Sequence, residues 1–184
     1  MAKFCEVCEA RRDNACQENL FPSISFCNGD ALAKSKKNSC DLIYKSQNKL
    51  FLIEHKIREW FLCFYQNIDE KKQQKKIKLI QRKIEGMLSL IEVETRKVLF
   101  LLLFSKKIQL PIFPTDDEGA KRAKQNVNRN IAIMDESFLK IYIKTRLFSQ
   151  IAPNDGLHAV TKDGKIVYLF TGECKEFSYF LRGL

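Results

Sequence analysis

The sequence lacks any apolar stretch long enough to cross a membrane. Its longest uninterrupted apolar run is "VLFLLLF" at 98–104, far below the roughly 20 residues that a spanning helix needs. The N-terminus, "MAKFCEVCEARRDN", has no apolar region of the kind found in signal peptides. We therefore expect a soluble, intracellular protein of the cytoplasm with no membrane partner.

Negative charge is scarce relative to positive charge. The 184 residues include 32 Lys and Arg against 22 Asp and Glu, which gives a formal net charge of +10. A basic surface attracts polyanions, and nucleic acid is the commonest polyanion inside a cell. The hydrophobic content of 45% is sufficient for a sizeable core, which argues against disorder and favours one domain.

The seven cysteines lack the spacing of a common zinc finger. "CEVC" at 5–8 has metal-ligand spacing, but no second C-x-x-C and no H-x-x-x-H pair follows. Zinc would need two further ligands, so the candidate set is Cys5, Cys8, Cys16 and Cys27. Two alternatives stay open: reduced, partly buried thiols, or disulfides of the kind found inside hyperthermophiles.

Hydrophobic periodicity predicts a mixed sheet flanked by helices. The sequence indicates a first helix at 3–19, an extended segment at 21–27 and a polar loop at 28–39. A hairpin follows, built from "CDLIYKS" and "KLFLIEHK" at 40–56, then an amphipathic helix at about 71–94 and a buried strand at 96–106. The fold class is therefore α/β or α+β with a mixed central sheet.

The last third of the chain predicts a loop, a helix and a hairpin. Residues 111–130 contain two prolines and a glycine, and a helix is expected from 134, with Asp135 or Ser137 near its start. "LHAVTKDGKIVYLFTG" at 157–172 is typical of a hairpin with an Asp-Gly turn. We expect residues 1–106 to form the core with its Cys-rich N-terminal part, and residues 107–184 to form an extension packed on the same domain.

Charged residues end the second strand of the first predicted hairpin. Side chains alternate across a strand, so Leu50, Leu52, Glu54 and Lys56 share one face. Asp41 on the partner strand can reach the same end if the hairpin register allows it. Two carboxylates suit Mg²⁺ or Mn²⁺, which would stabilise charge developing on phosphorus. Lys56 would orient or deprotonate the attacking water, or stabilise the oxyanion of the transition state.

This pattern, an Asp followed after twelve residues by Glu-x-Lys, resembles the PD-(D/E)XK nuclease superfamily. The matching residues are Asp41 in "SCDLIY" and Glu54 and Lys56 in "LIEHK", while Cys40 stands where the family often has proline. The resemblance covers about the first 105 residues and implies a restriction-endonuclease-like α-β-β-β-α-β core. It also implies the backbone carbonyl of His55 as a metal ligand.

Two further positions fit the resemblance. Glu9 precedes Asp41 by 32 positions, a spacing like that of archaeal Holliday-junction resolvases, and Glu6 and Glu18 are rivals for this metal-holding role. Gln81 lies on the apolar side of the helix after Glu-x-Lys, where the family often has a glutamine. In the Gln-x-x-x-Tyr subgroup a tyrosine follows four residues later, whereas this chain has Glu85.

The expected function is a metal-dependent nuclease that hydrolyses phosphodiester bonds in DNA, as an endonuclease or an exonuclease, with branched or structured DNA as a candidate substrate. The basic tract is expected to contact DNA through Lys71, Lys72, Lys75 and Lys76. Analogy with the resolvases suggests a homodimer. Two alternatives are a catalytically silent DNA-binding protein on the same fold, with a zinc-stabilised N-terminus, and a protein-interaction module with a Cys-rich knuckle.

Overall fold

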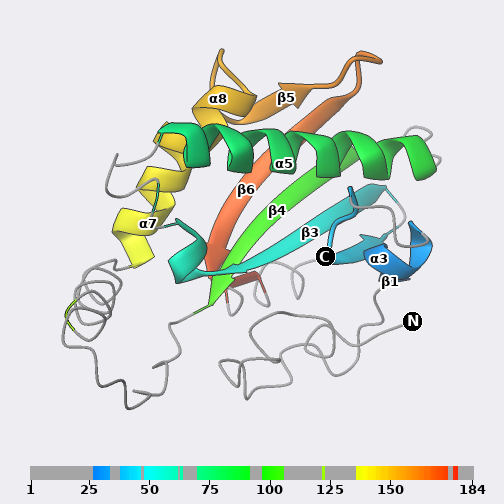
Figure 1. The fold of residues 1–184 in the computed structure, drawn as a ribbon. Helices are drawn as coiled ribbons and strands as arrows, with labels where there is room; N and C mark the ends of the chain where they lie inside the picture. The colour runs from blue at the N-terminus through cyan, green and yellow to red at the C-terminus, as the bar shows by residue number, and fades with distance from the viewer. Residues whose placement is uncertain are drawn as a thin grey trace.

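A six-stranded mixed sheet forms the centre of the molecule (Figure 1). The computed structural model describes residues 27–33, 38–46, 48–61, 63, 70–91, 97–105, 122, 136–173 and 176–177. The strands are β1 (Cys27–Asn28), β2 (Leu42–Lys45), β3 (Lys49–Ile57), β4 (Lys97–Ser105), β5 (His158–Val160) and β6 (Ile166–Glu173), in the spatial order β1-β2-β3-β4-β6-β5. Strands β3, β4 and β6 are parallel, and the remaining pairs are antiparallel. The mixed α/β class is therefore confirmed.

Helix α5 (Glu70–Leu90) lies across one face of this sheet (Figure 1). Its buried residues Ile77, Ile80, Ile84, Met87 and Leu88 recur at helical spacing, as an amphipathic helix requires. They belong to the same apolar cluster as alternate residues of β3, β4 and β6. The helix that the periodicity predicted is confirmed, although it ends at Leu90 rather than at 94.

The remaining helical segments are short. They are α3 (Gly29–Leu32), the 3₁₀ turn η1 (Arg58–Phe61), α7 (Glu136–Tyr142), the π-helical segment η2 (Ile143–Phe148) and α8 (Ser149–Ile151). The last three run on from one another and contribute Leu139, Ile143, Leu147 and Phe148 to the apolar cluster on the α5 side of the sheet. The predicted C-terminal helix is therefore confirmed from 136 onward, and residues 111–121 and 123–135 lie outside the described residues.

The polar loop predicted at 28–39 is wrong at its start. Asn28 belongs to β1 and the next four residues form α3. The Gly29 N–H donates a hydrogen bond of 3.1 Å to the Asp41 carbonyl, and a Cβ on Gly29 would lie 1.8 Å from the carbonyl oxygen of Cys40. Only glycine permits this approach, so a contact with a distant part of the chain fixes the turn. The predicted helix at 3–19 lies outside the described residues.

The C-terminal hairpin supplies an inner strand of the sheet. Strands β5 and β6 pair as predicted, with Gly164 at a φ of +74° in the turn. Strand β6 also pairs with β4 from Val98 to Phe104, so β4 has parallel neighbours on both sides. Residues 98–104 are no more than 3% exposed, which explains why this strand is apolar at every position.

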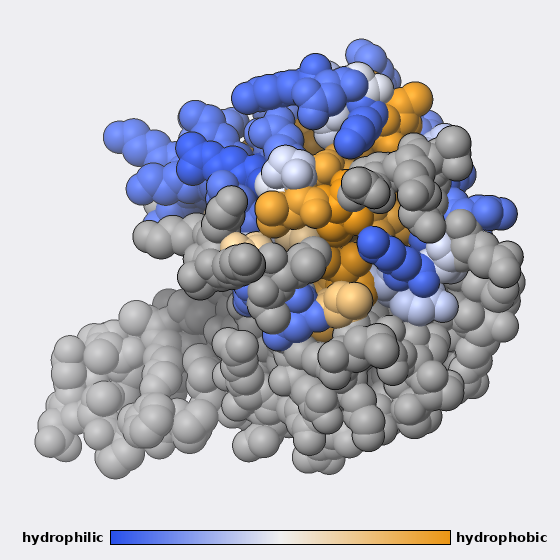
Figure 2. Space-filling view, turned by 90° about the vertical axis from the view of Figure 1, so that its right-hand side faces the viewer, coloured by the Kyte–Doolittle hydropathy of each residue, from blue (hydrophilic) through white to orange (hydrophobic). Residues whose placement is uncertain are grey.

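Apolar side chains also reach the surface of the described residues. In the view of Figure 2, hydrophilic side chains border a central group of apolar ones. Large apolar side chains that are more than half exposed are Ile141, Val160 and Ile166. Within the described ranges, no helix combines the length and the apolar character needed to cross a membrane.

Candidate active site

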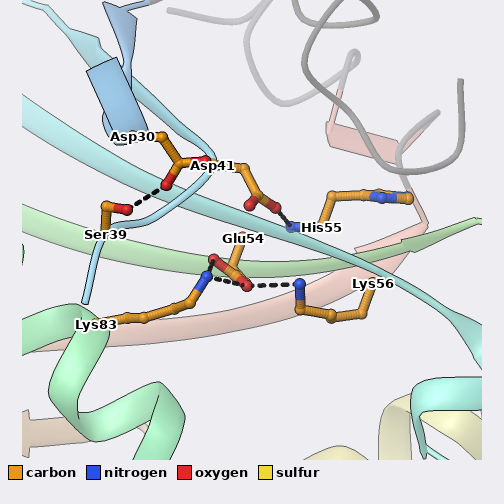
Figure 3. Close-up of polar contacts among 7 residues, drawn as sticks. All are labelled: Asp30, Ser39, Asp41, Glu54, His55, Lys56 and Lys83. Carbon is orange, nitrogen blue, oxygen red and sulfur yellow. Dashed lines mark hydrogen bonds and ion pairs between the residues drawn. The ribbon is translucent and has the colours of Figure 1, made fainter. Parts of the chain in front are cut away.

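The three residues of the Asp…Glu-x-Lys pattern lie at one end of the β2–β3 hairpin (Figure 3). Leu42, the first residue of β2, pairs with Ile53 of β3. Asp41, one residue earlier, is therefore level with the end of β3 that carries Glu54 and Lys56. This is the register that the three side chains need in order to meet.

The Asp41 carboxylate binds the edge of β3 at the point where the pairing with β2 ends. Its Oδ2 accepts a hydrogen bond of 2.7 Å from the His55 backbone N–H, which lies just beyond the paired part of β2. The carboxylate thus takes the place that a strand carbonyl would fill. Burial, and next the negative charge of Glu54, raise the pKa of Asp41 to about 7, against the opposing effect of Lys56 and Lys83. At neutral pH this carboxyl group is therefore close to its titration midpoint.

The Glu54 carboxylate is completely buried between two lysines (Figure 3). Lys83 Nζ lies 2.7 Å from Oε1 and 2.8 Å from Oε2, and Lys56 Nζ lies 2.8 Å from Oε1. The side chains of Lys56 and Lys83 are themselves only 7% and 13% exposed. Because a buried charge is costly unless it is paired, these two ammonium groups allow Glu54 to remain inside the protein.

Lys83 is a site residue that was not predicted from the sequence. It comes from α5, three residues after Ile80 and four before Met87, which are both fully buried. The spacing that places a side chain beside an apolar stripe was therefore visible in the sequence. Gly86, in the next turn, lets α5 come very close to the segment before β2, because a Cβ there would lie 2.4 Å from the Asn38 carbonyl oxygen. This approach brings Lys83 to the site.

Two other expected residues, Gln81 and His55, do not join the ion pairs of the site. Gln81 is half-buried on α5, and its side chain makes no hydrogen bond to another described residue. The His55 imidazole is 1% exposed, and neither ring nitrogen has a hydrogen-bond partner among the described residues. The roles predicted for Gln81 and for the His55 carbonyl stay predictions.

The structure does not test the metal ligands predicted near the N-terminus. Glu9 and its rivals Glu6 and Glu18 lie outside the described residues, as do Cys5, Cys8 and Cys16. The fourth zinc candidate, Cys27, is exposed in β1, and the described cysteines Cys27, Cys40 and Cys63 are free thiols. Burial raises the pKa of the Cys40 thiol well above its ordinary value, so this residue is an unreactive part of the core.

The lysines at the start of α5 differ in their exposure and contacts. Of the four predicted DNA contacts, Lys71, Lys72 and Lys75 are exposed, and we call these three the exposed lysines of α5; Lys78, which was not among the predicted contacts, is exposed as well. Lys76 is half-buried, donates a hydrogen bond to the Trp60 carbonyl and lies 4.5 Å from the centroid of the indole ring. Burial lowers the pKa of Lys76. Lys76 therefore holds the start of α5 against η1 through its contacts with Trp60.

Comparisons of the chain with models of protein families, with curated proteins and with solved structures found no match.

The residues present fit a divalent cation held by two carboxylates. Asp41 and Glu54 provide hard oxygen ligands, and the negative charge of Glu54 contributes to the raised pKa of Asp41. A cation bound by both groups would relieve that repulsion. Across the described part of the chain, no group of three or more His, Cys, Asp or Glu side chains is arranged to hold a metal. The remaining ligands would therefore be water and substrate oxygens, or groups from other parts of the chain.

Proposed function

We propose that this protein is a metal-dependent nuclease that hydrolyses phosphodiester bonds in DNA. The observation that carries the proposal is the convergence of Asp41, Glu54 and Lys56 at the end of β3, in the register that the Asp…Glu-x-Lys pattern requires. The order of β1, β2, β3, α5 and β4, with β4 parallel to β3, is compatible with a restriction-endonuclease-like core.

The chain's own residues have distinct roles in this proposal. Asp41 and Glu54 would hold Mg²⁺ or Mn²⁺, which supplies an activated water and stabilises negative charge on the phosphoryl group. The hydrogen bond from the His55 N–H fixes the orientation of the Asp41 carboxylate. Lys56, whose ammonium lies 2.8 Å from Glu54, would orient the attacking water or stabilise the developing oxyanion.

The charge of the protein supports a polyanionic substrate. The net charge is +10, and the exposed lysines of α5 lie on the helix that also carries Lys83. Lysines on a surface bind phosphates with little regard for base sequence. A DNA backbone lying along α5 would therefore be attracted close to the candidate site. A homodimer that holds branched DNA would follow from the same resemblance.

The experiment that tests this function compares wild type with Glu54→Gln and Lys56→Ala. Linear, nicked, single-stranded and four-way-junction DNA are incubated with each protein in Mg²⁺ or Mn²⁺. Glu54→Gln should abolish cleavage while DNA binding stays or rises, because carboxylate–phosphate repulsion is relieved. Lys56→Ala should also abolish cleavage yet leave the metal affinity largely intact. Wild-type cleavage rates from a folded Glu54→Gln protein would exclude this role for the site.

A second candidate function is a catalytically silent DNA-binding protein on the same fold. It is favoured by one observation: Lys83 engages both oxygens of Glu54, as expected of a permanent structural ion pair. In that case the wild type would cleave none of the four DNA forms, and binding through the exposed lysines of α5 would remain.

A further inference from the structure

The contact between Lys83 and Glu54 uses the same oxygens that a metal ion would need. We propose that Lys83 is a displaceable counter-ion, which neutralises Glu54 in the metal-free protein and leaves when a divalent cation binds. The inference rests on the proposed function, because it concerns the same carboxylate. Under this proposal, α5 controls the metal affinity of the site through Lys83.

The geometry distinguishes Lys83 from Lys56. Lys83 lies 2.7 and 2.8 Å from the two oxygens of Glu54, whereas Lys56 forms an ion pair of 2.8 Å with Oε1. An ammonium and a hard cation seek the same carboxylate lone pairs. While Lys83 is in place, it competes with a metal for both oxygens of Glu54. Removing Lys56 would not change that.

The charges at the site lead to the same conclusion. Two carboxylates, Asp41 and Glu54, lie beside two ammonium groups, so the four charges cancel when Asp41 is ionised. A divalent cation added to this set would leave a net positive charge in a largely buried site, which is unfavourable unless an ammonium moves away. The departure of Lys83 removes one charge and leaves Oε2 of Glu54 without an ammonium, while Lys56 still contacts Oε1.

Lys83 is also the more readily released of the two lysines. Its side chain is 13% exposed against 7% for Lys56, and its neighbour Arg82 on α5 is exposed. Lys56 lies on β3, an inner strand that pairs on both sides. A long flexible side chain on a surface helix can turn its ammonium to water while its aliphatic stem stays packed. The fold thus retains Lys56 and permits Lys83 to leave.

The test measures Mn²⁺ binding to the full chain by titration calorimetry, after treatment with a chelator and removal of the chelator. Lys83→Met should bind Mn²⁺ at least about tenfold more tightly than wild type, since a competing charge is removed. Lys56→Met removes the same charge and serves as the matched control, with a rise of less than about threefold because Lys83 still covers both oxygens. Lys83→Arg should bind no more tightly than wild type.

Each protein is first checked for folding by thermal melting, and Lys83→Gln replaces Lys83→Met if the latter does not fold. The rise in melting temperature on adding Mn²⁺ gives a second readout independent of DNA cleavage. Unchanged or weaker Mn²⁺ binding by folded Lys83→Met or Lys83→Gln, or an equal rise in Lys56→Met, would overturn the counter-ion role of Lys83. If the wild type still cleaves DNA, the proposed nuclease function would survive that result. No Mn²⁺ binding by any variant, together with an inert wild type, would overturn both.

Discussion

Replacing Asp41 with Asn should remove most of the pH dependence of stability between about pH 4 and 7. The pKa of Asp41 is about 7 in the folded protein against an ordinary value of 3.8. The folded state therefore binds this proton more tightly than the unfolded state does. Consequently, the stability contribution is greatest at low pH, falls as the pH rises through this window and levels off above pH 7.

The size of the effect follows from the shift. A difference of about three pKa units, at 1.36 kcal/mol per unit, corresponds to on the order of 4 kcal/mol of stability lost between pH 4 and 8. Asparagine resembles the protonated acid, since it carries no charge and its amide oxygen can still accept the His55 N–H. Asp41→Asn should therefore be more stable than wild type at pH 8 and similar to it near pH 4.

The assay is urea denaturation followed by circular dichroism at pH steps from 4 to 8, with a chelator present. Asp163→Asn is the matched control, because this exposed aspartate lies in the β5–β6 turn and Asn-Gly forms such turns as readily as Asp-Gly. The control should keep the wild-type slope of stability against pH. If Asp41→Asn keeps that slope as well, the burial argument for Asp41 is wrong.

Two further predictions concern α5. Replacing Lys71, Lys72 and Lys75 with Gln should weaken DNA binding and reduce the salt slope by about 0.9 for each phosphate that is no longer neutralised. Lys76→Gln should instead mainly lower the melting temperature, and salt-dependent DNA titrations and melting curves distinguish the two. Gly86→Ala should lower the free energy of unfolding by about 1–3 kcal/mol, because the new methyl group would clash with the Asn38 carbonyl, although alanine is the better helix former by about 1 kcal/mol. A stabilised Gly86→Ala protein in urea denaturation would contradict the close approach of α5.

The part of the site that lies within one hairpin could be predicted from the sequence. Alternation along β3 places Glu54 and Lys56 on one face, and the hairpin brings Asp41 level with them. Lys83 was not predicted, because periodicity alone does not distinguish a lysine at the margin of an apolar stripe from a solvated one. Its position depends on how closely Gly86 lets α5 approach, which is a property of the tertiary structure.

The fold, too, could be predicted from the sequence only in part. The β2–β3 hairpin, α5, β4 and the C-terminal hairpin follow from local patterns of apolar residues and turn residues. Helix α3 lies where local patterns predict a loop, because its conformation depends on the close approach of Gly29 to Cys40. The pairing of β4 with β6 joins segments far apart in the sequence, and no local pattern indicates which strand is the neighbour of which.

The pairing of β4 with β6 has a consequence for biosynthesis. Strand β4 leaves the ribosome well before β6, its second neighbour. At a synthesis rate of 5–20 residues per second, the roughly 60 residues between them correspond to a delay of about 3–12 s. Throughout that interval, the most apolar strand of the protein has an unpaired edge, to which a strand of another chain can add. Nascent chains that stop before residue 166 should therefore aggregate on release or need a chaperone, even though every residue of the Asp…Glu-x-Lys pattern has already been made.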